Sequence, residues 1–213
     1  MTEEEAQAWL KAEFNVPRET WDKLEAFIAF VREEMGHQNL ISKASAEQIW
    51  ARHIVDSAQL LKMAGIDDDP QASQKTWLDL GTGAGFPGIV IAIMSNDHVR
   101  MVESRNKRID FLMQAVEMLD IGDQSTVLGS RLEVISAFPV DVISARAFAP
   151  LDKLLAISHR FSTEKTVWLL PKGKNAVREL QALPEKWQKM FHVEQSLTDT
   201  DAKILVGRGK IGR

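Results

Sequence analysis

The chain has 213 residues, of which 45% are hydrophobic and 26% charged, and its formal net charge is −4. This length and composition predict one large globular domain, or one domain with a sizeable appendage. The chain has no cysteine, which excludes disulfides and thiolate metal sites, and its five histidines lack metal-ligand spacing. It also lacks an apolar run of the ~18 residues that span a membrane, and its acidic start does not resemble a secretory signal. We therefore expect a cytoplasmic protein without a metal, and the acidic balance argues mildly against a general nucleic-acid binder.

The first 72 residues are expected to form a helical extension ahead of the main domain. Apolar side chains follow Pro17 at helical spacing, at Trp21, Leu24, Ile28, Val31 and Met35. A capping-box pattern that starts at Ser45 predicts a second helix, which runs to about Leu61. The polar stretch 67–73 contains a proline and predicts a linker. We expect residues 1–72 and the domain of residues 73–213 to pack as one unit.

From residue 73 onward, short apolar runs alternate with amphipathic segments. The expected strands are 76–80, 99–103, 125–129, 140–145, 166–170, 190–195 and 202–207, and the expected helices are 88–95, 106–119, 150–161 and 174–182. Repeated strand–helix units predict an α/β fold with a mainly parallel sheet that helices cover on both faces. The last two strands could pair antiparallel at one edge. Ligands of such sheets bind beyond the carboxyl ends of the strands.

The most informative segment is the glycine-rich loop that follows the first strand. Its glycines, Gly81, Gly83 and Gly85, alternate with other residues, and the apolar run 89–94 follows at once. Glycine lets the backbone bend with positive φ and approach a ligand closely. The helix after such a loop is expected to present free N–H groups in its first turn. The segment therefore predicts a nucleotide-type cofactor site.

Two acidic residues help to identify the cofactor. Residues 83–88 also satisfy G-x-G-x-x-G, a pattern that by itself leaves a nicotinamide-dependent oxidoreductase as an alternative. Asp79, two residues before Gly81, suits a cationic ligand, and S-adenosylmethionine carries a sulfonium and an ammonium. Glu103 follows Gly81 by 22 residues (103 − 81) and ends the next strand, about the spacing of a ribose-binding acid. S-adenosylmethionine is thus the favoured cofactor.

Several segments together resemble one family, the bacterial ribosomal small-subunit methyltransferase G family, also called glucose-inhibited division protein B. The resemblance covers roughly residues 20–210 and rests on short motifs in a fixed order: 39–42, 52–57, 81–89, 103–104, 107–108, 111–112, 130–133, 144–149 and 172–173. It implies a class I S-adenosylmethionine-dependent methyltransferase, a Rossmann-like sheet flanked by helices. It also implies methyl transfer to guanine N7 in 16S ribosomal RNA. Carried over by position, the cofactor contacts would be Gly81, Phe86, Leu132, Glu133 and Arg146.

This chemistry sets modest demands on the chain. Guanine N7 has an exposed lone pair and no proton to remove, so positioning rather than a general base should carry catalysis. Arg146 is the candidate catalytic residue, because an arginine can donate to guanine O6. It could instead hold a phosphate or the cofactor carboxylate, or form an ordinary salt bridge. Phe148 could stack on a splayed base or belong to the core. His53 and Asp56 are three residues apart on one expected helix. With Arg52 they could shape the pocket floor or contact RNA, or they could pack the helix against the domain.

The substrate and its binding surface stay open at this level. Basic residues follow the second strand, at Arg105, Lys107 and Arg108, and others flank Gly173 at Lys172 and Lys174. If these groups converge, they form a basic rim around the cofactor site. The partner would be 16S ribosomal RNA, either free or in the assembled small subunit. A small-molecule or protein methyltransferase on the same fold is an alternative, since a fold does not fix a substrate.

Overall fold

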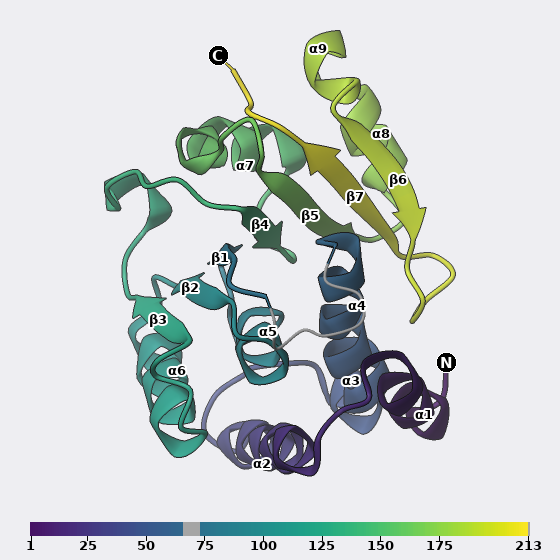
Figure 1. Ribbon diagram of the computed structural model, residues 1–213, viewed down its shortest axis with the longest axis vertical. Helices are drawn as coiled ribbons and strands as arrows, with labels where there is room; N and C mark the ends of the chain where they lie inside the picture. The colour runs from purple at the N-terminus through teal and green to yellow at the C-terminus, as the bar shows by residue number, and fades with distance from the viewer. Residues whose placement is uncertain (66–72, 213) are drawn as a thin grey trace.

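Seven strands form one sheet in the middle of the molecule, with helices on both faces (Figure 1). The computed structural model describes residues 1–65 and 73–212. The strands are β1 (Thr76–Leu80), β2 (His98–Val102), β3 (Ser125–Leu128), β4 (Val142–Ala145), β5 (Val167–Lys172), β6 (Phe191–Gln195) and β7 (Lys203–Arg208). Their order across the sheet is β3-β2-β1-β4-β5-β7-β6. The predicted strands, and the α/β architecture with helices on both faces, are confirmed.

The direction of the strands distinguishes this sheet from a dinucleotide-binding one. Strands β1 to β5 are parallel, whereas β7 runs antiparallel between β5 and β6. The expected antiparallel pairing of the last two strands is confirmed, with β6 at the edge. A dinucleotide fold orders six strands 3-2-1-4-5-6. The topology therefore argues against the oxidoreductase alternative.

Side chains alternate between the two faces of the sheet and fill two separate cores. In β1, Trp77 belongs to one buried cluster, whereas Leu78 and Leu80 belong to the other. Such alternation is the period-2 pattern of a strand buried on both faces. The first core contains residues of α1 (Glu3–Phe14), α2 (Arg18–Glu34), the π-helical turn η1 (Trp50–Val55), α4 (Asp56–Met63), α5 (Gly88–Met94) and α6 (Asn106–Met118). The second contains residues of η3 (Leu132–Val134), α7 (Leu151–Ser158), η4 (His159–Phe161) and α8 (Ala176–Gln181), with α9 (Glu185–Gln188) close by.

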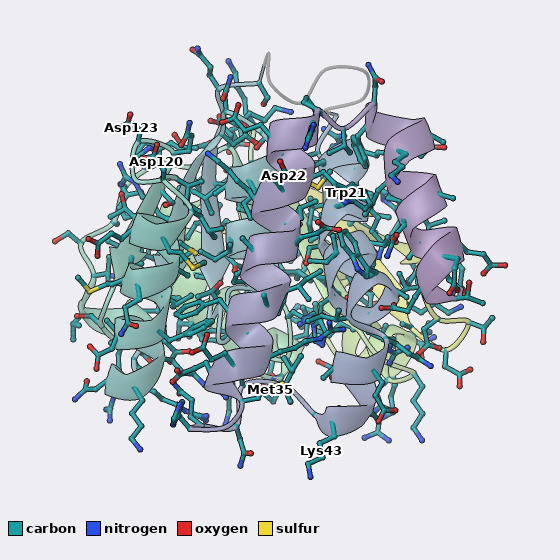
Figure 2. All side chains as sticks on the ribbon, turned by 90° about the horizontal axis from the view of Figure 1, so that it is seen from below. Trp21, Asp22, Met35, Lys43, Asp120 and Asp123 are labelled. Carbon is teal, nitrogen blue, oxygen red and sulfur yellow. The ribbon has the colours of Figure 1, made fainter. Side chains whose placement is uncertain are left out.

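The N-terminal helices cover the same face of the sheet as α5 and α6. Figure 2 looks onto this layer, with α2 in the middle, α6 on one side and α1 on the other. Trp21 near the start of α2 stacks on Trp50 at a ring distance of 4.6 Å. The Lys23 side chain donates to the carbonyl of Asp120, just beyond α6. The described part of the extension is thus packed onto the domain.

One helix start differs from the prediction. Ser42, not Ser45, caps α3 (Lys43–Glu47), because its hydroxyl accepts from the Ser45 N–H at 3.1 Å. The helix expected to run to Leu61 is interrupted after α3 and winds through η1 before α4 begins. Residues 67–72 of the predicted linker, and with them the proposed division after residue 72, lie outside the described residues. Within the described residues, no helix is long and apolar enough to cross a membrane.

Candidate active site

A buried hydrogen-bond chain fixes the loop between β1 and α5. Asp79 is fully buried, and its carboxylate accepts from the Gly88 N–H at 3.0 Å and from the Ser144 hydroxyl at 2.7 Å. Ser144 accepts in turn from the Trp77 indole at 2.8 Å. Burial raises the pKa of Asp79, and the hydrogen bonds from its neighbours oppose that shift. Asp79 therefore faces into the protein, where it ties the loop to β4, and not toward a bound cation.

The same contact changes the expected role of the helix start. The Gly88 N–H donates to Asp79, and the Ile89 N–H donates to the carbonyl of Gly85 at 2.8 Å. The expectation that the first turn of α5 presents free N–H groups is therefore wrong for these two. The strand-end carboxylate thus lies beneath the loop and occupies the Gly88 N–H that was expected to face a ligand.

The three loop glycines occupy different surroundings. All three have positive φ, between 61° and 87°. Gly81 lines a pocket, and a methyl group added there would overlap the ring of Phe148. At Gly85, an added methyl group would lie 2.6 Å from Ile89, and at Gly83 it would lie 3.3 Å from the Arg108 guanidinium. Of the three, only Gly81 is on the pocket wall.

Phe86 is buried behind this loop. Its ring lies 5.1 Å from Phe27 of α2 and 4.6 Å from His53 of η1, and it is 3% exposed. The Arg146 guanidinium lies 5.6 Å from the ring centre. The structure thus places Phe86 between the loop and the N-terminal helices.

A pocket of about 320 Å³ lies at the carboxyl ends of β1 to β4. Gly81 follows β1, Glu103 follows β2, Leu132 and Glu133 follow β3, and Phe148 follows β4. Gly81, Glu103, Leu132 and Glu133 are sequence-predicted cofactor residues, and all four therefore line one pocket. Phe148 lines the same pocket but was not predicted as a cofactor residue. Neighbouring parallel strands end at the same edge of the sheet, so these four positions converge although they span 53 residues (133 − 81 + 1).

The Glu103 carboxylate is held at one oxygen and open at the other. Oε1 accepts from the N–H groups of Ser104 and Arg105, at 2.7 and 2.9 Å. Oε2 lies 3.8 Å from the Arg108 guanidinium, beyond hydrogen-bond distance. The backbone contacts orient the side chain and leave Oε2 available to accept from hydroxyl groups.

A larger pocket of about 930 Å³ adjoins the first and shares Ala147 and Phe148 with it. Ala147 has φ of 52°, a left-handed conformation that is uncommon for a residue other than glycine. Phe148 is half-buried, packs against the second core and lines both pockets. Both sequence interpretations of Phe148 thus agree with its position, and the ring lies where the two pockets meet.

Arg146 lines the larger pocket and is held by the N-terminal helices. Its Nη1 donates to the Arg52 carbonyl at 3.1 Å and to Asp56 Oδ2 at 3.3 Å, and its Nη2 donates to His53 Nδ1 at 2.7 Å. A guanidinium has five N–H donors. Three are thus engaged, and two are left for a ligand.

His53 is a neutral acceptor in this arrangement. Since arginine can only donate, Nδ1 accepts and the ring proton is on Nε2, which is buried without a hydrogen-bond partner among the described residues. Burial, together with the positive charges of Arg146 and Arg52, lowers the pKa of His53 to about 3. His53 therefore stays uncharged at neutral pH and orients Arg146.

The loop between β6 and β7 also contributes to the site, which the sequence did not indicate. Asp56 Oδ1 accepts from the hydroxyls of Ser196 and Thr198, at 3.3 and 3.0 Å. Arg52 forms an ion pair with Asp199 at 2.5 Å. The mostly polar run 196–201 between two strands was the available signal, but it is equally typical of an exposed turn. Only the tertiary fold brings this loop into contact with η1 and the start of α4.

The basic residues do not form one continuous rim. Lys172 and Lys174 line the larger pocket, whereas Arg105, Lys107 and Arg108 line a third pocket of about 440 Å³ with Gln38 and Asn39. The third pocket shares lining residues with the pocket of Glu103 and none with the pocket of Arg146. In the described parts of the chain, no group of three or more acidic or histidine side chains is arranged to hold a metal ion.

Comparisons with known proteins agree with this architecture. A family model described as rRNA small subunit methyltransferase G matches residues 20–205. Ribosomal RNA small subunit methyltransferase G of Rhizorhabdus wittichii is 51% identical, over 100% of this chain and 99% of its own length. The protein of the same name from Zymomonas mobilis is 50% identical, over 97% and 93%. A putative S-adenosyl-L-methionine-dependent methyltransferase from Methanococcus maripaludis shares the fold, with a TM-score of 0.55, 10% identity and coverage of 76% and 86%.

Proposed function

The chain belongs to the rRNA small subunit methyltransferase G family, and from this premise we propose how its two pockets methylate guanine N7 in 16S ribosomal RNA. The fold is that of a class I methyltransferase, and the enzyme transfers a methyl group from S-adenosylmethionine to ribosomal RNA. The observation that carries the proposal is the junction of the two pockets at Ala147 and Phe148. One pocket takes the methyl donor, the other takes the target nucleotide, and the two reactants meet at the junction.

The smaller pocket fits S-adenosylmethionine. Because Gly81 has no side chain, the Phe148 ring can lie directly against the loop at the pocket wall. Glu103 offers its Oε2 atom to the ribose hydroxyls. Leu132 is buried and apolar and suits the adenine face, while the exposed Glu133 follows it on the pocket wall. When bound, this cofactor supplies an electrophilic methyl group. The supporting residues Asp79, Gly83, Gly85 and Phe86 position the loop from behind.

The larger pocket suits the target guanine through Arg146. Two N–H groups of its guanidinium are uncommitted among the described residues, and a guanine presents O6 as an acceptor beside N7. A donor on O6 orients the base and leaves the N7 lone pair free. Phe148 offers its ring for stacking on that base. We therefore assign Arg146 the catalytic role and Phe148 a stacking role.

The chain needs no general base for this reaction, because N7 carries no proton. His53 agrees with this, since its low pKa and its contact with Arg146 suit an orienting acceptor rather than a proton carrier. Positioning of two reactants can supply about 7–11 kcal/mol of a barrier in favourable cases. The rigid hold on Arg146 from Arg52, His53 and Asp56 is what such positioning requires.

The decisive experiment is methyl transfer from radiolabelled S-adenosylmethionine to small ribosomal subunits that lack the modification, followed by strand cleavage specific for N7-methylguanine. We expect label in 16S RNA and cleavage at one guanine. Label without N7-specific cleavage would refute the assignment of the target atom. A parallel reaction with protein-free 16S RNA tests whether the assembled subunit is needed, which we expect for an enzyme with net charge −4. Because its substrate is bacterial ribosomal RNA, we propose that the enzyme acts in the cytoplasm.

A variant of Arg146 separates its two candidate roles. With Arg146→Ala, we expect a fall of at least about 100-fold in kcat, while the affinity for S-adenosylhomocysteine stays within about twofold. A large loss of S-adenosylhomocysteine affinity would assign Arg146 to the cofactor carboxylate instead.

A further inference from the structure

The cations that line the larger pocket fall into three groups: those paired with a carboxylate, one bonded to neutral acceptors, and those without a partner among the described residues. Six basic side chains contribute to its wall: Arg52, Arg146, Lys172, Lys174, Arg178 and Lys203. The first three form ion pairs with Asp199, Asp56 and Glu179, at 2.5, 3.3 and 2.9 Å. Lys203 donates to the Gln195 side chain and to the Thr200 carbonyl. Lys174 and Arg178 are exposed, and no described residue pairs with either side chain.

This division matters for a polyanionic substrate. A cation that already has a carboxylate partner is largely neutralised, so a phosphate gains little from approaching it. An unpaired cation that neutralises a phosphate instead releases counterions condensed on the RNA, which favours binding at low salt. Phosphate contacts of this kind fix the position of a nucleic acid on a protein without reading its sequence.

We propose that Lys174 and Arg178 bind phosphates of the RNA strand next to the target guanine, at the entrance of the pocket that contains Arg146. This inference rests on the proposed function, because it assumes that the guanine enters this pocket. Lys174 comes from the segment after β5, and Arg178 comes from α8. Both residues line the same pocket as Arg146. A strand held there would deliver its base toward the junction at Phe148.

A second basic cluster provides the competing path. Arg105 and Lys107 are also unpaired among the described residues, but they line the third pocket, which shares no wall with the pocket of Arg146. Arg105 also lines the cofactor pocket, so phosphates bound there would lie on the cofactor side of the site. We therefore assign the phosphates nearest the target to Lys174 and Arg178.

The test is the salt dependence of the KM for unmethylated small ribosomal subunits, from about 50 to about 200 mM KCl. The logarithm of affinity falls linearly with the logarithm of salt concentration, and each lost phosphate contact makes this fall less steep by about 0.7–0.9. Lys174→Gln and Arg178→Gln should therefore each reduce the salt-induced rise in KM by about threefold, and the double variant by about tenfold. The kcat at saturating substrate and the affinity for S-adenosylhomocysteine should stay unchanged.

Lys165→Gln is the matched control, because Lys165 is exposed and precedes β5 at the opposite end of that strand. An unchanged slope in the Lys174 and Arg178 variants, or an equal fall in Lys165→Gln, would overturn the inference. A fall confined to Arg105→Gln would place the strand at the third pocket and would also overturn it. If the wild-type enzyme methylates no guanine N7, the proposed function fails. If it methylates N7 but the Lys174 and Arg178 variants keep the wild-type salt slope, only this inference fails.

Discussion

Replacement of His53 by glutamine should remove an identifiable part of the acid sensitivity of the fold. His53 is 6% exposed, and burial together with the charges of Arg146 and Arg52 lowers its pKa to about 3, while an unfolded chain restores a value near 6.5. Between these values the unfolded state binds a proton that the folded state does not, so stability falls as pH falls below about 6.5. From pH 7.5 to pH 5, this single group should cost about 2 kcal/mol of unfolding free energy.

The variant is chosen so that only the titration changes. The amide oxygen of glutamine can still accept from Arg146, but the amide binds no proton in this range. Urea unfolding at pH 7.5 and pH 5 gives two free energies for each protein, and their difference is compared between wild type and variant. Asp79 and Asp97, whose pKa values are raised by burial, stabilise the folded state toward acid. Their contribution cancels in the comparison.

We expect the wild type to lose about 2 kcal/mol more than His53→Gln on acidification, equivalent to about 4–8 °C in Tm for a chain of this size. His37→Gln is the control, because His37 is exposed and should leave the wild-type loss intact. Equal acid sensitivity in wild type and His53→Gln would refute the view that His53 is buried as a neutral acceptor.

Three further variants test the cofactor pocket and its support. Gly81→Ala should weaken S-adenosylhomocysteine binding by at least about tenfold in calorimetry with little change in circular dichroism, because its methyl group overlaps Phe148 and its φ of 64° disfavours alanine; equal affinity would contradict this. Glu103→Gln should weaken S-adenosylhomocysteine binding by about 10–100-fold, since a charge-assisted hydrogen bond is lost, and RNA binding should not change. An effect on RNA binding alone would assign Glu103 to the RNA instead of the cofactor. Ser144→Ala should lower the unfolding free energy by about 2–3 kcal/mol, because it leaves the buried Trp77 indole without a partner and leaves Asp79 Oδ1 without the Ser144 hydroxyl; a change below about 0.5 kcal/mol in urea unfolding would show that the chain of bonds is dispensable.

The cofactor half of the site was accessible from the sequence because it follows from topology. Once a mainly parallel sheet is predicted from alternating strands and helices, the residues after β1, β2 and β3 must meet at one edge. Gly81 and Glu103 were placed in this way, Leu132 was placed by the family resemblance, and all three lie in one pocket. Whether they bind the cofactor is for the variants above to test.

The support of the site was not accessible, because it depends on which side chains meet across the fold. The pattern around Asp79 predicts a strand end with a carboxylate, but only the register of β1 beside β4 brings Ser144 under it. In the same way, nothing local shows that Asp199 would reach Arg52, 147 residues earlier. Hydrophobic periodicity reports which face of an element is buried, and it does not report its polar partners.

These partners bear on how the N-terminal helices should be regarded. All three described acceptors of the Arg146 guanidinium (the Arg52 carbonyl, His53 and Asp56) come from η1 and the start of α4, before residue 72. Removing one partner of a largely buried pair typically costs about 3–5 kcal/mol, since it leaves the remaining charge unpaired. The Arg146 side chain is 23% exposed, so solvent would offset part of that cost but would not restore its orientation. The described helices of the extension therefore belong to the candidate active site, because they hold the residue that we assign to the guanine.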